Sequence, residues 1–185
     1  LIFTHSDYDH IIGRGAFPRS KVTASKAFHL KKDKQSDVDA ALKWDAEHYI
    51  DRGYPIEYPK VDHIVDKDGK SINFSGNVLT FYFAPGHTPE GMMITYEPAG
   101  VLIAGDYLSD IEFPFVEDSI EQYHRTLSKV DRILRSHQIN YMVPGHGSIA
   151  TGVEEIRRRQ AESVEYLNDL IDSSLSIANL EKKYA

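Results

Sequence analysis

The spacing of apolar and polar residues changes several times along the chain, and each change marks a predicted element. Residues 1–3 are apolar and predict the end of a buried strand, and residues 21–25 predict a second short strand. From there to about Arg52 the chain is polar and rich in lysine, and its apolar residues recur at an approximate helical spacing. The prolines and tyrosines of residues 54–59 end this pattern and predict a loop.

Beyond this loop the pattern predicts strands interleaved with helices. Residues 62–74 show a two-residue period around Asp68-Gly69, which predicts a β-hairpin with its turn at this pair. Further strands are expected at residues 78–85, 91–97, 100–106 and 140–143. Amphipathic helices are expected at residues 120–134 and 153–171, and a short helical tail follows. This order favours a layered α/β domain without internal repeats or a flexible linker.

Composition narrows the class of protein without changing this architecture. The 185 residues are 41% hydrophobic and 26% charged, as in a soluble globular protein, and no apolar run approaches the roughly 20 residues that span a bilayer. The net charge of −7, with no basic block beyond Arg157-Arg158-Arg159, does not favour nucleic-acid binding. The chain has no cysteine and therefore no disulfide or thiolate, which is consistent with a reducing cytoplasm. We expect a cytoplasmic protein.

Histidine and aspartate residues stand directly behind predicted strands. The five that do so are His5, His10, His87, Asp106 and His146. Because strand ends in layered α/β folds are where functional loops gather, we expect these side chains to form one site. Imidazole and carboxylate are ligands of zinc, iron or manganese when thiolate is absent.

The stretch THSDYDH, residues 4–10, adds two aspartates to the histidines. In an extended chain, residues two apart point to the same side, so His5 and Asp7 can face one metal ion. Asp9 and His10, at the turn into a helix, can face another. The complete set is too large for one tetrahedral ion and suits two ions about 3.5–4 Å apart that share water and a carboxylate.

Four motifs in order, THSDYDH, PGHTPEG, AGD and PGHG, resemble the pattern of the metallo-β-lactamase superfamily. That pattern is H-x-H-x-D-H, followed by G-H-[ST], G-D and G-H. The resemblance implies an αββα sandwich with a dinuclear site, most often zinc, at the edge between two sheets. By this resemblance His5 and His87 bind the first ion, and Asp106 bridges both ions. The implied ligands of the second ion are Asp9, His10 and His146.

Asp7 departs from the family pattern, because it stands where the family usually has its second histidine. It can bind the first ion through a shifted loop, bind it through water, or leave that ion loosely held. A carboxylate here also favours iron or manganese relative to zinc. Flavodiiron proteins of the same superfamily carry a glutamate at this position and hold two irons.

The start of the chain is a second departure, because the family has several strands before its first motif. We therefore expect residues 1–185 to form a single metallo-β-lactamase-like domain that lacks its N-terminal strands and has an incomplete first sheet.

The resemblance implies a hydrolase in which two divalent ions supply hydroxide to a small-molecule ester, thioester or lactone. Asp9 can orient the nucleophile, and Tyr107, beside Asp106, can hydrogen-bond a substrate oxyanion. Three alternatives stay open: a di-iron oxidoreductase, a phosphodiesterase or nuclease, and a non-catalytic metal-binding module. We expect no nucleic-acid partner and no membrane partner. Arg157-Arg158-Arg159 can hold an anionic substrate, although a solvated helix face is the commoner use of such a run.

Overall fold

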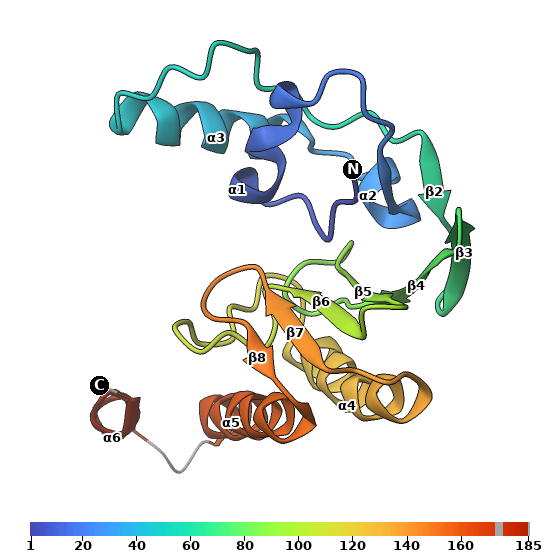
Figure 1. Ribbon diagram of the computed structural model, residues 1–185. Coiled ribbons are helices and arrows are strands. Elements are labelled where there is room, and N and C mark those ends of the chain that lie inside the picture. The colour runs from blue at the N-terminus through green and yellow to red at the C-terminus, as the bar shows by residue number, and fades with distance from the viewer. Residues whose placement is uncertain (173–175, 185) are drawn as a thin grey trace.

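The structure is a computed structural model that describes residues 1–172 and 176–184 (Figure 1). Its strands are β1 (Thr23–Ser25), β2 (His63–Val65), β3 (Lys70–Phe74), β4 (Asn77–Phe83), β5 (Met92–Tyr96), β6 (Val101–Gly105), β7 (Tyr141–Pro144) and β8 (Ala150–Thr151). Its helices are α1 (Tyr8–Ile11), the 3-10 helix η1 (Ile12–Ala16), α2 (Lys26–Leu30), α3 (Gln35–Glu47), α4 (Ile120–Ser136), α5 (Val153–Ile171) and α6 (Ile177–Tyr184). Within the described residues, no helix is both long and apolar enough to cross a membrane.

Two sheets and two groups of helices form the layers of the fold. Strands β1 and β2 pair in parallel as a small sheet, and Ile2 extends it through a single bridge to Thr23. The larger sheet has the order β3-β4-β5-β6-β7-β8; its first four strands are antiparallel, and β7 runs parallel to β6. Helices α4 and α5 cover one face of this sheet, and the small sheet with α1, α2 and α3 lies on the other side (Figure 1). This arrangement confirms the predicted mixed α/β sandwich.

The large sheet is buried on both faces, as the alternation of its side chains requires. Tyr82 and Met93 belong to the core formed with α4 and α5, whereas their chain neighbours Phe81, Met92 and Ile94 belong to a core on the opposite face. Successive residues of a strand point to opposite faces, so apolar residues at every position bury both. Each buried side chain of this size contributes about 1.5–3 kcal/mol relative to an exposed one.

The predicted hairpin at residues 62–74 is wrong. Strand β2 pairs with β1 in the small sheet, while β3 pairs with β4 in the large sheet, with Phe74 opposite Asn77. The actual turn is Ser75-Gly76, where both residues have the positive φ that two-residue hairpin turns favour. The two-residue period of residues 62–74 covers both β2 and β3, but this period does not show which strand each one pairs with.

The helical stretch predicted up to Arg52 is interrupted rather than continuous. Ser25 caps α2 by accepting a hydrogen bond from the Phe28 amide at 3.0 Å. The backbone leaves the helical region at Lys31, and Asp33 accepts a hydrogen bond from the Ser36 amide at 3.2 Å where α3 begins. The structure confirms the helices predicted at residues 120–134 and 153–171, with bounds that agree within two residues. It also confirms, within two residues, the strands predicted at residues 78–85, 91–97, 100–106 and 140–143. The short strand β8 was not indicated by any sequence pattern.

Candidate metal centre

The strand ends place the histidines and aspartates at one edge of the large sheet. Strands β6 and β7 are parallel, so Asp106 and His146 follow ends that lie together. Strand β4 runs in the same direction as β6, because both are antiparallel to β5, and His87 follows its end. Residues 4–10 approach this edge from the other layer, where the amide of Met92 donates to the Thr4 carbonyl at 2.8 Å.

Four side chains from these segments form a first group: His5, Asp7, His87 and Asp106. Asp7 Oδ2 lies 3.0 Å from His87 Nε2 and 3.6 Å from His5 Nε2. Asp106 Oδ2 lies 3.5 Å from each of the same two nitrogens. A tetrahedral ion with bonds near 2.1 Å separates its ligand atoms by about 3.4 Å, so these spacings suit one such ion.

The second group consists of Asp9, His10 and His146. Asp9 Oδ2 lies 3.2 Å from His10 Nε2 and 3.0 Å from His146 Nε2, and the two nitrogens are 3.3 Å apart. Asp106 connects the groups, because its Oδ1 is 3.0 Å from His10 Nε2 while its Oδ2 faces the first group. Its carboxylate is therefore placed to bridge two ions.

Asp7 reaches the first group although it stands at the N-cap of helix α1. A residue there commonly caps the helix, yet the Asp7 side chain makes no capping hydrogen bond. Burial opposes its charge, but the nearby His5 imidazole and a hydrogen bond with His87 outweigh that effect and hold the pKa of Asp7 well below its ordinary value. The loop thus brings the shorter carboxylate within direct reach of a shared ion.

In His87 and His5, the contacts of the ring nitrogen Nδ1 determine that Nε2 faces the centre. His87 Nδ1 donates to the Phe115 carbonyl at 2.8 Å, so Nε2 is the nitrogen that faces the centre, where it contacts Asp7 and where a metal ion would replace its proton. His5 Nδ1 contacts Thr4 Oγ1 at 3.0 Å. His5 Nε2 is buried and has no hydrogen-bond partner among the described residues. Because a buried polar nitrogen without a partner is costly, this atom fits a metal ion.

The charge of the cluster also fits divalent cations. Burial disfavours the charge of Asp106, but the neighbouring imidazoles of His10 and His5 outweigh this effect and hold its pKa well below the ordinary value. Burial likewise opposes the charge of His10, whereas hydrogen bonds with Asp106 and Asp9 raise its pKa to about 10. Three ionised carboxylates thus converge where two divalent ions would offset them and would displace the His10 proton.

Gly145 allows the loop behind β7 to approach the ligands closely. A Cβ atom at this position would clash with Asp106 Oδ1 and would lie 2.8 Å from His10 Cε1. Any side chain would therefore displace the ligands.

Tyr107 does not point its hydroxyl at a substrate position, in contrast to the role expected from the sequence. It is buried, and its hydroxyl lies 2.9 Å from the Pro85 carbonyl and 3.1 Å from the Ala84 carbonyl. The same oxygen accepts a hydrogen bond from the His87 amide at 3.0 Å. Tyr107 therefore fastens the loop that carries His87.

A buried polar cluster behind the ligand loop was missed by the sequence reasoning. Ser6, between His5 and Asp7, lies within hydrogen-bond distance of Asp37 and Glu90. Lys31 Nζ donates to Ser6 Oγ at 2.8 Å and pairs with Asp37 at 2.8 Å. The position of Glu90 within PGHTPEG was the available signal, because it stands in the same motif as His87.

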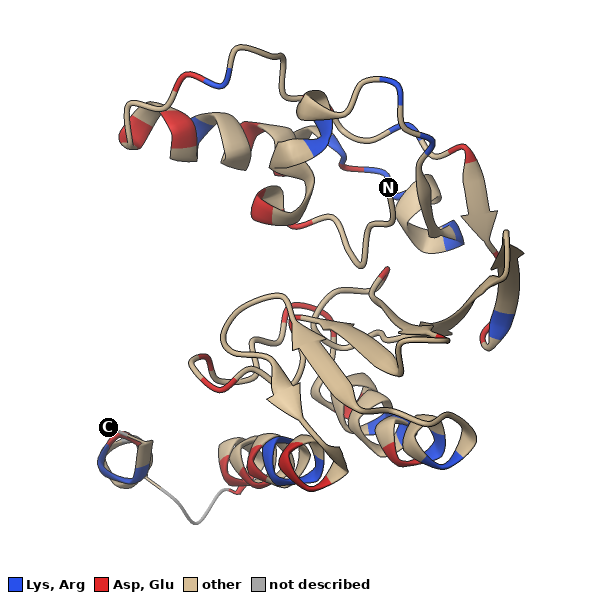
Figure 2. Ribbon diagram, in the orientation of Figure 1, with Lys and Arg blue, Asp and Glu red and all other residues tan. Residues whose placement is uncertain are grey.

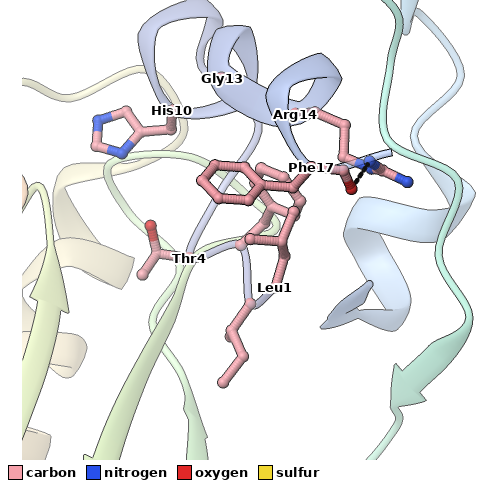
Figure 3. A pocket seen from close by; sticks show the side chains of 8 residues that line it. Leu1, Thr4, His10, Gly13, Arg14 and Phe17 are labelled. Atoms are coloured by element: carbon pink, nitrogen blue, oxygen red, sulfur yellow. Dashed lines mark hydrogen bonds between the residues drawn. The ribbon is translucent and has the colours of Figure 1, made fainter. Parts of the chain in front are cut away.

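A pocket of about 240 Å³ opens beside His10 (Figure 3). Leu1, Ile2, Phe3 and Phe17 give it mostly apolar walls. The guanidinium of Arg14 lies at the far side from His10 and donates to the Phe17 carbonyl at 2.6 Å (Figure 3).

Comparison with known proteins supports the fold and the family. The family model of the metallo-beta-lactamase superfamily matches residues 1–150. A curated relative, "Probable metallo-hydrolase YqgX" of Bacillus subtilis, is 27% identical over 109 residues, which are 58% of this chain and 48% of that protein. The chain thus spans about half the length of the curated relative it matches.

Solved structures of several proteins share the fold. An archaeal metallo-beta-lactamase superfamily protein of Sulfolobus tokodaii has a TM-score of 0.62 at 16% identity, covering 99% of this chain and 75% of that one. A metallo-beta-lactamase family protein of Thermus thermophilus has a TM-score of 0.61 at 19% identity, with 91% and 60% covered. Rubredoxin oxygen:oxidoreductase of Desulfovibrio gigas has a TM-score of 0.56 at 16% identity, with 91% and 44% covered. With its family model matched over residues 1–150, the chain belongs to the metallo-β-lactamase superfamily.

Proposed function

We propose that the protein is a metal-dependent hydrolase that holds two divalent metal ions and cleaves a small-molecule ester, thioester or lactone. Of the candidate metals, we propose zinc. The observation that carries this proposal is the pair of ligand groups joined by Asp106, with ligand atoms at spacings that suit metal ions. The curated relative named as a metallo-hydrolase supports the same reaction class.

Two divalent ions bound in this centre would polarise a scissile carbonyl and lower the pKa of a metal-bound water to about 7. Asp106 holds the two ligand groups at one spacing through its two oxygens. Asp9 is the most exposed of the three carboxylates, with 33% of its side chain accessible against 20% for Asp7 and 12% for Asp106. It is therefore placed to orient the attacking water and accept its proton. Tyr107 keeps His87 in position from behind.

The segments around the centre favour an uncharged substrate. Residues 84–91, 106–119 and 144–149 contain no lysine or arginine, whereas acidic residues occur in the first two segments (Figure 2). Phe115 exposes its ring beside His87, at 6.3 Å between ring centroids. Apart from Arg14 at the far side of the pocket beside His10, this acidic, partly apolar surround disfavours a phosphodiester or another anion and accommodates a neutral acyl compound.

A second candidate is a di-iron oxidoreductase, and one observation favours it. Asp7 gives the first group a second carboxylate in place of an imidazole, and harder oxygen ligands suit iron or manganese. Two results together would favour this candidate over the hydrolase. The purified protein would contain two irons per chain with an absorption spectrum that changes on reduction, and the zinc-loaded protein would hydrolyse none of the substrates.

The test combines metal loading with a substrate panel. The protein is loaded with zinc, manganese or iron and assayed against neutral esters, thioesters, lactones and a phosphodiester. We expect turnover of a neutral acyl substrate, and a loss of at least about a hundredfold in Asp106→Asn together with loss of bound metal. Asp39→Asn, on the outer surface of α3, removes the same charge away from the centre and should behave as wild type. Full metal content and turnover in Asp106→Asn would refute the proposal.

A further inference from the structure

Arg159 is the buried member of the run Arg157-Arg158-Arg159 on helix α5. Its side chain is 3% exposed, whereas Arg157 and Arg158 are on the surface. Arg158 forms ion pairs with Glu155 at 2.7 Å and Glu162 at 2.5 Å along the helix. The solvated helix face expected for this run therefore holds for its first two residues but not for the third.

The guanidinium of Arg159 connects the two loops that carry Asp106 and His146. Its Nη1 donates to the Ser148 carbonyl at 2.8 Å and to the Leu108 carbonyl at 3.2 Å. Leu108 is two residues beyond Asp106, and Ser148 is two residues beyond His146. One buried cation thus contacts both ligand loops from the side of α5.

Asp110 completes the connection between the loops. Its Oδ2 lies 3.3 Å from Arg159 Nη2, and its Oδ1 accepts a hydrogen bond from the Ser148 amide at 2.8 Å. A Cβ atom on Gly147 would clash with the same Oδ1, so Asp110 packs directly against the backbone beside His146. The Asp110 carboxylate therefore reaches from the first loop to the second.

The backbone held by this pair is strained. Leu108 has a φ of 62°, in the left-handed region that residues with a side chain rarely adopt. Such conformations persist only where the surrounding structure enforces them. The hydrogen bond from Arg159 to the Leu108 carbonyl is one such contact.

We propose that Arg159 and Asp110 are positioning residues that hold the Asp106 and His146 loops at one spacing and so maintain the second metal position. The inference rests on the proposed two-ion centre. Neither residue touches the ligand atoms; both act through the backbone of the ligand loops. Loss of the guanidinium would leave the buried Leu108 carbonyl and the partly buried Ser148 carbonyl without this donor and release both loops.

The experiment compares Arg159→Met with Arg158→Met. Zinc is titrated into each metal-free protein against a chromophoric chelator, which yields the number of ions bound and the affinity of each. We expect Arg159→Met to weaken the second ion about tenfold to a hundredfold and the first ion less, because Asp106 is the only member of the first group on a loop that Arg159 contacts. Arg158→Met, an equal change on the surface of the same helix, should bind both ions as wild type does.

Two further variants keep the result interpretable if Arg159→Met folds poorly. Asp110→Asn, at a partly exposed position, should weaken the second ion in the same direction while its Tm stays close to that of wild type. Arg159→Lys should recover part of the affinity, because an ammonium can reach one of the two carbonyls. If Arg159→Met bound both ions with wild-type affinity, the inference would be overturned while the proposed centre would stand. If Arg159→Met does not fold, wild-type affinity for both ions in Asp110→Asn would have the same meaning. Fewer than two ions in the wild-type protein would overturn the proposed centre as well.

Discussion

Asp7 contacts the candidate metal centre with its side chain and does not cap helix α1, at whose start it stands. It begins helix α1 but turns its carboxylate to His87, at 3.0 Å, instead of capping the helix. The sequence predicted that these histidines and aspartates gather at one site, because apolar strands followed by histidine or aspartate indicate where those residues lie, and their role as metal ligands stays a prediction. The sequence indicated Arg159 and Tyr107 but not the contacts that they make, because these depend on which backbone carbonyls the tertiary fold brings beside them.

Asp7→Ala tests the first ligand group. The variant removes one oxygen that faces both His5 and His87, so we expect the first ion to bind at least about tenfold more weakly, with the second ion less affected. Competition titration with a chelator measures both affinities. Asp7→His, which supplies the imidazole of the family pattern, should bind two ions. Unchanged affinity for both ions in Asp7→Ala would show that Asp7 is not a ligand.

Gly145→Ala tests the close approach of the β7 loop. The added methyl group would clash with Asp106 and crowd His10, so we expect loss of metal binding and of turnover by at least about tenfold. Gly13→Ala is a matched control, because a Cβ atom there would have no neighbour within 4 Å. Metal content by elemental analysis distinguishes the two variants. Equal metal content would contradict the geometry described for this loop.

At the scale of elements, the strands that carry the ligands follow from the sequence, whereas their partners do not. The apolar runs of β4, β5, β6 and β7 are continuous and bounded by glycine or proline, which made these strands predictable. The connection between β2 and β3 was misread as a turn, because a period of two does not show that the chain passes from one sheet to the other. Asp68 fixes this connection to helix α4 through Lys129 at 3.1 Å and Arg132 at 3.0 Å.

The contacts of Asp68 predict a dependence of stability on pH. Burial raises its pKa, but hydrogen bonds from the Phe83 amide, Lys129 and Arg132 outweigh this and lower the pKa below its ordinary value. A lowered folded-state pKa gives stability that is present above the unfolded-state pKa, near 4, and is lost as pH falls through the folded value.

Urea unfolding of Asp68→Asn between pH 7 and pH 3 measures this contribution. After screening by solvent, we expect the variant to be less stable than wild type by about 1 kcal/mol at pH 7, with the difference shrinking below pH 4. Asp66→Asn, which removes an exposed carboxylate paired with Lys70, should show little pH-dependent difference. A difference that persisted unchanged at pH 3 would contradict the assignment to Asp68.

At the scale of the whole molecule, the candidate centre joins the two layers of the fold. Residues 5–10 belong to the layer of α1, whereas His87, Asp106 and His146 extend from the large sheet (Figure 1). The layered α/β class was predictable from the order of strands and helices, and the motif order indicated the superfamily. The assignment of β2 to the small sheet required the tertiary contacts.

Metal binding should therefore stabilise the whole fold. In the metal-free protein the protonated His10 offsets only part of the charge of three converging carboxylates, and ions that bind only the folded state stabilise it by mass action. At a free zinc concentration a hundredfold above Kd, we expect the free energy of unfolding to rise by about 2.7 kcal/mol. Denaturant unfolding with zinc and with a chelator measures the change. Asp106→Asn should lose most of the increase, and an equal increase in that variant would place the stabilising ion elsewhere.

The most direct test of the central claim is anomalous X-ray diffraction from crystals of the zinc-loaded protein. We predict two anomalous peaks about 3.5–4 Å apart, with Asp106 between them. One peak should lie among His5, Asp7 and His87, and the other among Asp9, His10 and His146. Peaks confined to other parts of the surface, or a fully loaded crystal without a peak among these side chains, would contradict the two-ion centre.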